Sequence, residues 1–172
     1  MKIAVISDTH LRGTKFPEHI AELLTGSDMI IHAGDILELP IIDELRSIAR
    51  VVAVRGNMDS AEVRRELPSR QVIELAGFKI GVTHGQGAPS GIVERVRTEF
   101  GDVDCIIFGH THQPLVLEKE GILFFNPGSP TDRIFAKRNT IGFLHVGDVI
   151  RPEIVEIKGG DNPGLWRKVF GK

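Results

Sequence analysis

Residues 2–10, KIAVISDTH, join a short apolar, β-branched run to a polar ending, because the run stops at Asp8. Similar apolar runs at 29–32, 51–54 and 103–108 also predict buried strands. Segments with helical periodicity lie between these runs, at 17–24, 41–49 and 92–100. Pro17 suits a first helical turn, and Gly101 closes the last of these helices. Strands and helices therefore alternate along this part of the chain.

A hairpin pattern begins after Ala61. The apolar runs 71–75 and 78–83 are separated only by Ala76 and Gly77, and later runs at 116–119, 122–125, 141–146 and 149–157 also lack helical spacers. We infer an α/β fold in which two packed, mixed β-sheets are flanked by helices. We expect one domain over residues 1–158 and a C-terminal appendage over residues 159–172, which starts with a linker-like segment.

The composition excludes several classes of protein. The 172 residues suffice for one compact domain, and 21 basic against 23 acidic residues give a net charge of −2, which disfavours general nucleic-acid binding. Cys105 is the single cysteine, so neither an internal disulfide nor a cysteine-rich zinc site can form. No stretch approaches the ~20 apolar residues that span a bilayer, and the N-terminus lacks the apolar core of a signal peptide. We expect a cytoplasmic protein without membrane contact.

Polar residues that can bind metal ions follow the predicted strands repeatedly. They are Asp8, His10, Asp35, Asn57, His84, His110 and His112. Because ligands gather outside the carboxyl ends of strands in α/β sheets, we expect these side chains to converge on one rim. Within Asp8–His10 and within His110–His112 the spacing of two puts both side chains on one side of an extended segment. Neighbouring glycines would let the backbone bring the side chains to a shared centre; these are Gly34, Gly56, Gly85 and Gly109.

The types of these residues predict transition-metal ions rather than calcium. Imidazole suits Mn²⁺, Fe²⁺, Ni²⁺, Co²⁺ and Zn²⁺, whereas Ca²⁺ and Mg²⁺ favour shells of oxygen alone. Seven ligands are too many for one tetrahedral ion but suit two ions ~3.5 to 4 Å apart, with Asp35 as the natural bridging carboxylate. Two divalent ions and two aspartates leave a charge of about +2, which should attract phosphate.

Five ordered motifs in this sequence resemble those of the calcineurin-like metallophosphoesterases. They are DTH at Asp8, GD at Gly34, GNMD at Gly56, THG at Thr83 and GHTH at Gly109, and NPGS at Asn126 extends the likeness toward the small prokaryotic, YfcE-like phosphodiesterases. The resemblance implies a four-layer αββα sandwich of the metallo-dependent phosphatase type.

The resemblance also implies which residues hold each metal ion. One ion would be bound by Asp8, His10, Asp35 and His112. The second would be bound by Asp35, Asn57, His84 and His110, and we assign catalytic roles to Asp35, Asn57 and His84. We expect Mn²⁺ first, with Ni²⁺, Co²⁺, Fe²⁺ or Zn²⁺ as alternatives. The expected reaction is attack of a metal-bridging hydroxide on the phosphorus of a small-molecule phosphodiester.

Met58 departs from the wider superfamily, where many members have a histidine that is thought to protonate the leaving group. A thioether cannot donate a proton, and a general acid is worth ~10²- to 10⁴-fold, so the sequence favours diesters with good leaving groups. Phosphomonoesterase activity is an alternative. A second alternative is a non-catalytic protein-interaction scaffold of the same fold, of the kind found in the retromer complex. A homodimer is a further prediction, and no residue can be assigned to substrate binding from the sequence.

Several other polar residues have structural interpretations. Asp59 with Glu62 resembles a helix capping box, and we interpret His32 as a packed structural residue. The turn at 126–129 is expected to support the ligands. Arg55 and Arg133 could each contact a substrate phosphate, with surface ion pairing as an equal contender.

Overall fold

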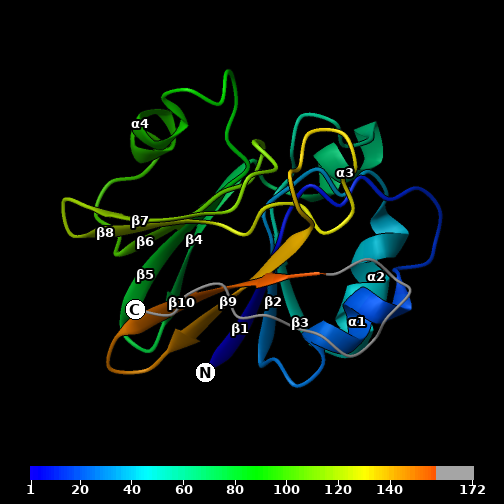
Figure 1. Cartoon of the computed structure of the whole chain (residues 1–172), viewed down its shortest axis with the longest axis horizontal. Coiled ribbons are helices and arrows are strands. Elements are labelled where there is room, and N and C mark those ends of the chain that lie inside the picture. The colour runs from blue at the N-terminus through cyan, green and yellow to red at the C-terminus, as the bar shows by residue number, and fades with distance from the viewer. Residues whose placement is uncertain (158–172) are drawn as a thin grey trace.

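The computed structural model describes residues 1–157, which form two five-stranded sheets with helices on their outer faces (Figure 1). The first sheet has the strand order β10-β9-β1-β2-β3 and the second has the order β4-β5-β6-β8-β7. The strands are β1 (Lys2–Ile6), β2 (Met29–His32), β3 (Arg50–Ala53), β4 (Arg70–Leu75), β5 (Phe78–Thr83), β6 (Cys105–Ile107), β7 (Leu115–Lys119), β8 (Ile122–Asn126), β9 (Thr140–Val146) and β10 (Ile150–Glu156). The helices are α1 (Glu18–Leu24), α2 (Leu39–Ile48), α3 (Ala61–Glu66) and α4 (Ile92–Arg97).

Each sheet contains three neighbouring parallel strands. In the first sheet β1 pairs with β2, and β2 pairs with β3, with Ile6 opposite His32 and His32 opposite Ala53. In the second sheet β5 pairs with β6, and β6 pairs with β8. The remaining strands β9, β10, β4 and β7 are antiparallel to their neighbours. Both sheets are therefore mixed, and each brings the carboxyl ends of three strands to one edge.

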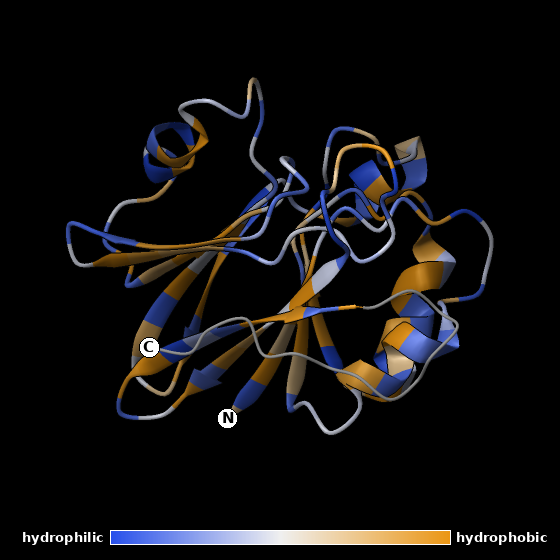
Figure 2. Cartoon of the chain, in the orientation of Figure 1, coloured by the Kyte–Doolittle hydropathy of each residue, from blue (hydrophilic) through white to orange (hydrophobic). Residues whose placement is uncertain are grey.

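Three apolar clusters separate the layers of the fold. One cluster lies between the sheets and includes Ile31 and Ile107, whereas a second packs α1 and α2 against the outer face of the first sheet. The third packs α4 against the outer face of the second sheet, where Val96 joins Phe108 and Phe124. Figure 2 shows the corresponding banding of hydrophobic and hydrophilic residues along strands and helices. This is the expected αββα sandwich.

The sequence pattern predicted the strands and helices well, with small shifts at their ends. For example, β6 covers only Cys105–Ile107 of the apolar run 103–108, and α4 ends at Arg97 rather than at residue 100. Among residues 1–157, no helix has both the length and the apolar character that crossing a membrane requires. The predicted appendage, residues 159–172, lies outside the described residues, so the domain boundary stays a prediction.

Candidate metal centre

The seven sequence-predicted ligands lie on loops at the carboxyl ends of five parallel strands. Asp8 and His10 follow β1, and His110 and His112 follow β6. The others each follow one strand: Asp35 after β2, Asn57 after β3 and His84 after β5. Because these strands come from both sheets, the loops meet where the two carboxyl edges approach each other (Figure 1). The structure thus brings together residues separated by more than 100 positions.

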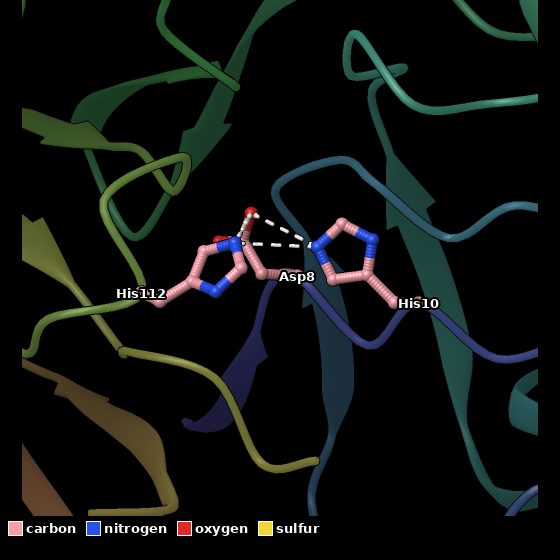
Figure 3. A group of neighbouring side chains, drawn as sticks. All are labelled: Asp8, His10 and His112. Atoms are coloured by element: carbon pink, nitrogen blue, oxygen red, sulfur yellow. Dashed lines mark hydrogen bonds and ion pairs between the residues drawn. The ribbon is translucent and has the colours of Figure 1, made fainter. Parts of the chain in front are cut away.

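Asp8, His10 and His112 form one compact group whose ligand atoms all lie within 4.8 Å of one another. The Nε2 atoms of His10 and His112 are 3.2 Å apart, and His112 Nε2 lies 3.3 Å from Asp8 Oδ1. Figure 3 shows both imidazole rings turned toward the Asp8 carboxylate. Three atoms that can donate electron pairs therefore face one small volume, as a metal site requires.

A second group consists of Asp8, Asp35 and His84 and has the same compactness. Asp35 Oδ2 lies 3.4 Å from His84 Nε2 and 3.7 Å from His10 Nε2, so one carboxylate oxygen faces both groups. Asp8 also belongs to both groups, since its Oδ1 lies 3.8 Å from His84 Nε2. Each of the two aspartates therefore lies between the two groups, where its carboxylate could be shared by two metal ions.

Asn57 and His110 extend the second group. Asn57 Oδ1 lies 3.2 Å from His84 Nε2 and 3.1 Å from His110 Nδ1. His110 Nε2 lies 2.8 Å from the carbonyl oxygen of Gly87, to which a protonated Nε2 donates. That bond leaves the lone pair of His110 on Nδ1, the nitrogen that faces Asn57. All seven predicted ligands thus occur in one connected cluster.

Hydrogen bonds on the far side of two rings fix which nitrogen faces the cluster. His84 Nδ1 lies 2.8 Å from the carbonyl oxygen of Ala33, and His112 Nδ1 lies 2.6 Å from Asp132 Oδ2. When Nδ1 donates these bonds, Nε2 has the free lone pair and points at the aspartates. Metal-binding histidines are commonly oriented in this way by a carbonyl or a carboxylate.

The neighbouring aspartates shift the pKa values of the imidazoles in the cluster. Burial on its own would lower the pKa of His112, but Asp8 and Asp132 outweigh it and raise that pKa to about 9. Burial would likewise lower the pKa of His84, whereas its bond to Asp35 raises it overall. For Asp35 burial favours a higher pKa, but His84 and the Met58 amide hold the pKa below its usual value. The cluster therefore stabilises positive charge next to its two carboxylates.

Asp8 Oδ1 tests whether a cation fits this cluster. This oxygen is buried, and among residues 1–157 it has no hydrogen-bond partner, although three imidazole Nε2 atoms lie within 4.0 Å of it. A buried carboxylate oxygen without a partner is costly, and a divalent cation between it and the imidazoles would satisfy it. The donor set of carboxylates, imidazoles and one amide oxygen also matches borderline transition metals. The residues present fit two divalent ions.

The backbone at the cluster is strained in a way that supports a functional site. Eight non-glycine residues in the described part of the chain have positive φ, and five of them are predicted ligands. These five are Asp8, His10, Asp35, His110 and His112, with φ between 47° and 69°. Aspartate and histidine tolerate this left-handed region better than most residues, yet it is sparsely populated and concentrates at active sites.

Three of the predicted glycines are required for space, and a Cβ at Gly34 would lie 2.7 Å from His84 Nδ1. A Cβ at Gly109 would overlap Ser7 Oγ and lie 2.7 Å from Asp8 Oδ2. A Cβ at Gly56 would overlap the Asp35 carboxylate in the same way. The loops after β3 and β6 therefore reach the ligands of β1 and β2 only because these positions have no side chain.

Two acidic residues at the site were not predicted in these roles. Asp132 binds His112, and nothing at the end of a strand marks it, because it lies in the loop before β9. The capping prediction for Asp59 was wrong. The N-cap of α3 is Ser60, whose Oγ accepts from Val63 N, whereas the Asp59 carboxylate accepts from the amides of Leu37 and Gly56. Asp59 precedes the cap by one residue and instead joins the loops that bear Asp35 and Asn57.

The turn at 126–129 supports the ligand loops, as expected. Ser129 Oγ donates to the carbonyl oxygen of Asp8 at 2.7 Å, and Asn126 Nδ2 donates to that of Gly109 at 2.8 Å. Nearby, His32 is fully buried and its Nε2 lies 3.0 Å from Thr9 Oγ1. Burial lowers the pKa of His32 to about 3, so this ring is a neutral packed residue beside the Asp8 loop.

The cluster opens into a cleft of about 880 Å³. The cleft is lined by five of the predicted ligands, namely His10, Asp35, Asn57, His110 and His112, and also by Met58, Arg133, Ile134 and Phe135. A smaller hollow of about 350 Å³ also has Asn57 in its lining, together with Arg55, Arg70 and His84, among others. Each of the two predicted arginines thus lines one of these spaces.

The chain is similar to known proteins both in sequence and in fold. The sequence pattern of the calcineurin-like phosphoesterase superfamily domain matches residues 1–149. A probable metallophosphoesterase of Methanocaldococcus jannaschii is 43% identical over 137 residues, covering 76% of this chain and 69% of the relative. A phosphodiesterase of the same organism is 28% identical over 142 residues, covering 74% and 83%. The crystal structure of wild-type Vps29 complexed with Zn²⁺ from Entamoeba histolytica has a TM-score of 0.76 at 26% identity, covering 98% and 97%.

Proposed function

The chain belongs to the calcineurin-like phosphoesterase superfamily, and from this premise we propose that it hydrolyses small-molecule phosphodiesters with two divalent metal ions. The observation that carries this proposal is the buried Asp8 Oδ1, which faces three imidazole nitrogens and lacks a hydrogen-bond partner within the described residues. The phosphodiesterase relative supports the choice of a diester substrate.

Two sets of side chains would hold the ions. The first set is Asp8, His10, Asp35 and His112, and the second is Asp35, Asn57, His84 and His110. When bound by these side chains, two divalent ions would supply Lewis acidity and would lower the pKa of a bound water. Mn²⁺ is the first candidate, followed by Ni²⁺, Co²⁺, Fe²⁺ and Zn²⁺.

The residues of this chain contribute position and charge. Ala33 and Asp132 hold the rings of His84 and His112 with Nε2 toward the centre, so the rings need little reorganisation on binding. Two divalent ions with Asp8 and Asp35 leave a charge of about +2, which attracts the phosphate anion. Because Gly56 and Gly109 have no side chain, their loops lie close to Asp35 and Asp8, and Asp35 Oδ2 faces both groups of side chains.

Met58 supports a diester with a good leaving group. Its side chain lines the cleft and is 59% exposed, so it stands where a substrate can reach it. Because a thioether cannot protonate a leaving oxygen, the reaction depends on leaving groups that tolerate negative charge. This argument favours activated diesters over alkyl monoesters.

The test is hydrolysis of bis(p-nitrophenyl) phosphate and of p-nitrophenyl phosphate by metal-depleted protein, with each of Mn²⁺, Ni²⁺, Co²⁺, Fe²⁺, Zn²⁺ and Mg²⁺ restored separately. We expect metal-dependent turnover that favours the diester. Asp8→Asn is the matched control, since it keeps the size of the side chain but weakens both groups of ligands. Faster hydrolysis of the monoester would contradict diester specificity.

A scaffold function is the second candidate, because the likeness to Vps29 extends over nearly the whole of both chains. The two candidates differ in one outcome. A protein that binds two metal ions but hydrolyses neither ester with any of them would contradict the enzyme proposal and favour the scaffold.

A further inference from the structure

Exposed apolar side chains gather at the mouth of the cleft that leads to the candidate metal centre. Seven large hydrophobic residues are exposed within residues 1–157, and three of them, Met58, Ile134 and Phe135, line this cleft. Ile134 and Phe135 are the most exposed of the seven, at 81% and 68%. Single exposed hydrophobic residues are common, but a group that rims a cavity indicates a binding surface. We call these three residues the apolar shelf.

The loop that bears Ile134 and Phe135 is fastened to the metal centre. Asp132 Oδ1 accepts from the amide of Ile134 at 2.9 Å, and Asp132 Oδ2 accepts from the amides of Phe135 and Ala136 at 2.9 and 2.7 Å. The same Oδ2 contacts His112 Nδ1. Gln113 Nε2 also donates to the carbonyl oxygen of Phe135 at 2.6 Å. One carboxylate therefore positions both a candidate metal ligand and two of the three shelf residues.

Phe135 is placed next to the ligands themselves. Its ring lies edge to face with the ring of His112, with centroids 5.8 Å apart and an interplanar angle of 82°. Because most of the Phe135 side chain is still exposed, the ring can contact both His112 and a ligand in the cleft. A group attached to a phosphate at the metal centre would thus meet the shelf directly.

We propose that the apolar shelf binds a flat aromatic group on one arm of the phosphate ester and so determines the substrate class. The cleft of about 880 Å³ accommodates a ligand of nucleotide size. Phenylalanine stacks on aromatic rings, and the methionine thioether makes favourable contacts with them. Aryl esters and nucleobases share this chemistry. The inference rests on the proposed function, because it places the phosphate at the metal centre.

The test measures binding rather than turnover. The metal-loaded chain is titrated calorimetrically with phenylphosphonate and with methylphosphonate, which differ only in the apolar group. We expect phenylphosphonate to bind roughly tenfold more tightly, as burial of one face of a ring would give. In the double variant Ile134→Ala, Phe135→Ala this advantage should fall to about twofold or less, while the dissociation constant of methylphosphonate stays unchanged.

Matched variants separate the shelf from general effects of apolar surface. Val72→Ala removes an apolar side chain that is 51% exposed on β4, outside the cleft, and should leave the phenyl preference intact. Phe135→Tyr keeps the ring and should also retain the preference. Ile134 and Phe135 are both exposed, so the melting temperature of the double variant should stay close to that of the parent.

Two further ligands define the chemistry of the group. Hexylphosphonate is apolar but not flat, and tighter binding of it than of phenylphosphonate would overturn the aromatic assignment. The pair uridine 5′-phosphate and ribose 5-phosphate differs in the base, so a base advantage that the double variant abolishes supports a nucleobase as the natural source. An advantage confined to phenylphosphonate supports a simple aryl ester.

The two proposals fail in different ways. Equal affinity for phenyl- and methylphosphonate in a protein that hydrolyses diesters overturns the shelf inference alone. A phenyl preference that depends on the shelf, in a protein that hydrolyses no ester, supports the shelf and overturns the proposed reaction.

Discussion

Asp132→Asn should weaken the binding of one metal ion and leave the other almost unchanged. Asp132 Oδ2 accepts from His112 Nδ1 at 2.6 Å and from two loop amides, and Oδ1 accepts from a third. Burial would raise the pKa of Asp132, but these donors lower it to about 2, so the group is a carboxylate at neutral pH. Asparagine keeps the size and one acceptor oxygen but removes the charge.

The size of the effect follows from the bond to His112. A hydrogen bond to a charged group contributes about 1.5–3 kcal/mol, against about 0.5–1.5 kcal/mol for a neutral pair. The midpoints of these ranges differ by about 1.25 kcal/mol, which corresponds to a metal affinity roughly eightfold to tenfold weaker. Asp132→Ala also releases the loop amides, and its effect should approach about a hundredfold.

The assay is a calorimetric Mn²⁺ titration of the metal-depleted chain. The account predicts two binding events in the parent and a roughly tenfold weakening of only one in Asp132→Asn. Asp148→Asn, at an exposed position between β9 and β10, is the control that changes net charge by the same amount. Parent-like affinity at both sites, or equal weakening of both with a lower melting temperature, would refute the positioning role of Asp132.

Three other perturbations test separate parts of the account. Gly109→Ala should lower the free energy of unfolding by about 1–3 kcal/mol, because the new Cβ would overlap Ser7 Oγ, whereas Gly101→Ala meets no atom within 4 Å and should be neutral in urea melts. His32 has a pKa of about 3 when folded against 6.5 when unfolded, so the metal-free protein should lose stability as the pH falls from about 6.5 toward 3, by about 5 kcal/mol at most. His32→Gln should flatten that slope, and an unchanged slope would contradict the assignment. Met58→His should speed hydrolysis of diesters with poor leaving groups by about a hundredfold and leave p-nitrophenyl diesters nearly unaffected, whereas equal gains on both would exclude a missing general acid.

The sequence carried enough information to predict the layers and the seven candidate ligands. Apolar runs of β-branched residues mark strands wherever they occur, and parallel strands in α/β folds present their following loops at one edge. Asp8, Asp35 and His84 each follow such a run closely, so their convergence could be inferred before any coordinates. For these three residues, the position directly after a strand was enough to predict their place in the site.

The supporting residues could not be predicted, because their partners are distant in the chain. Asp132, in the loop between β8 and β9, is hydrogen-bonded to His112, in the loop after β6. Asp59 accepts hydrogen bonds from the loops after β2 and β3. Such contacts depend on how loops from different strands meet in space, which no periodicity records. Asp59 and Glu62 have the spacing of a capping box, but Ser60 is the N-cap of α3. The carboxylate of Asp59 instead accepts hydrogen bonds from the amides of Leu37 and Gly56.

The apolar shelf was missed for a related reason. Ile134, Phe135 and Ala136 form a three-residue apolar segment in a polar loop, a pattern too short to indicate a surface. Only the bonds from Asp132 and Gln113 place this segment beside His112. The strands and the ligands that follow them can therefore be predicted from the local sequence, whereas the walls of the cleft depend on contacts between residues that are distant in the chain.

The most direct measurement is a Mn²⁺ titration of the metal-depleted chain in which bound metal and hydrolysis of bis(p-nitrophenyl) phosphate are followed together. The account predicts saturation at two ions per chain, with turnover that rises as the second site fills. Saturation at one ion, or two bound ions without hydrolysis, would contradict the claim that this cluster is a dinuclear phosphodiesterase centre.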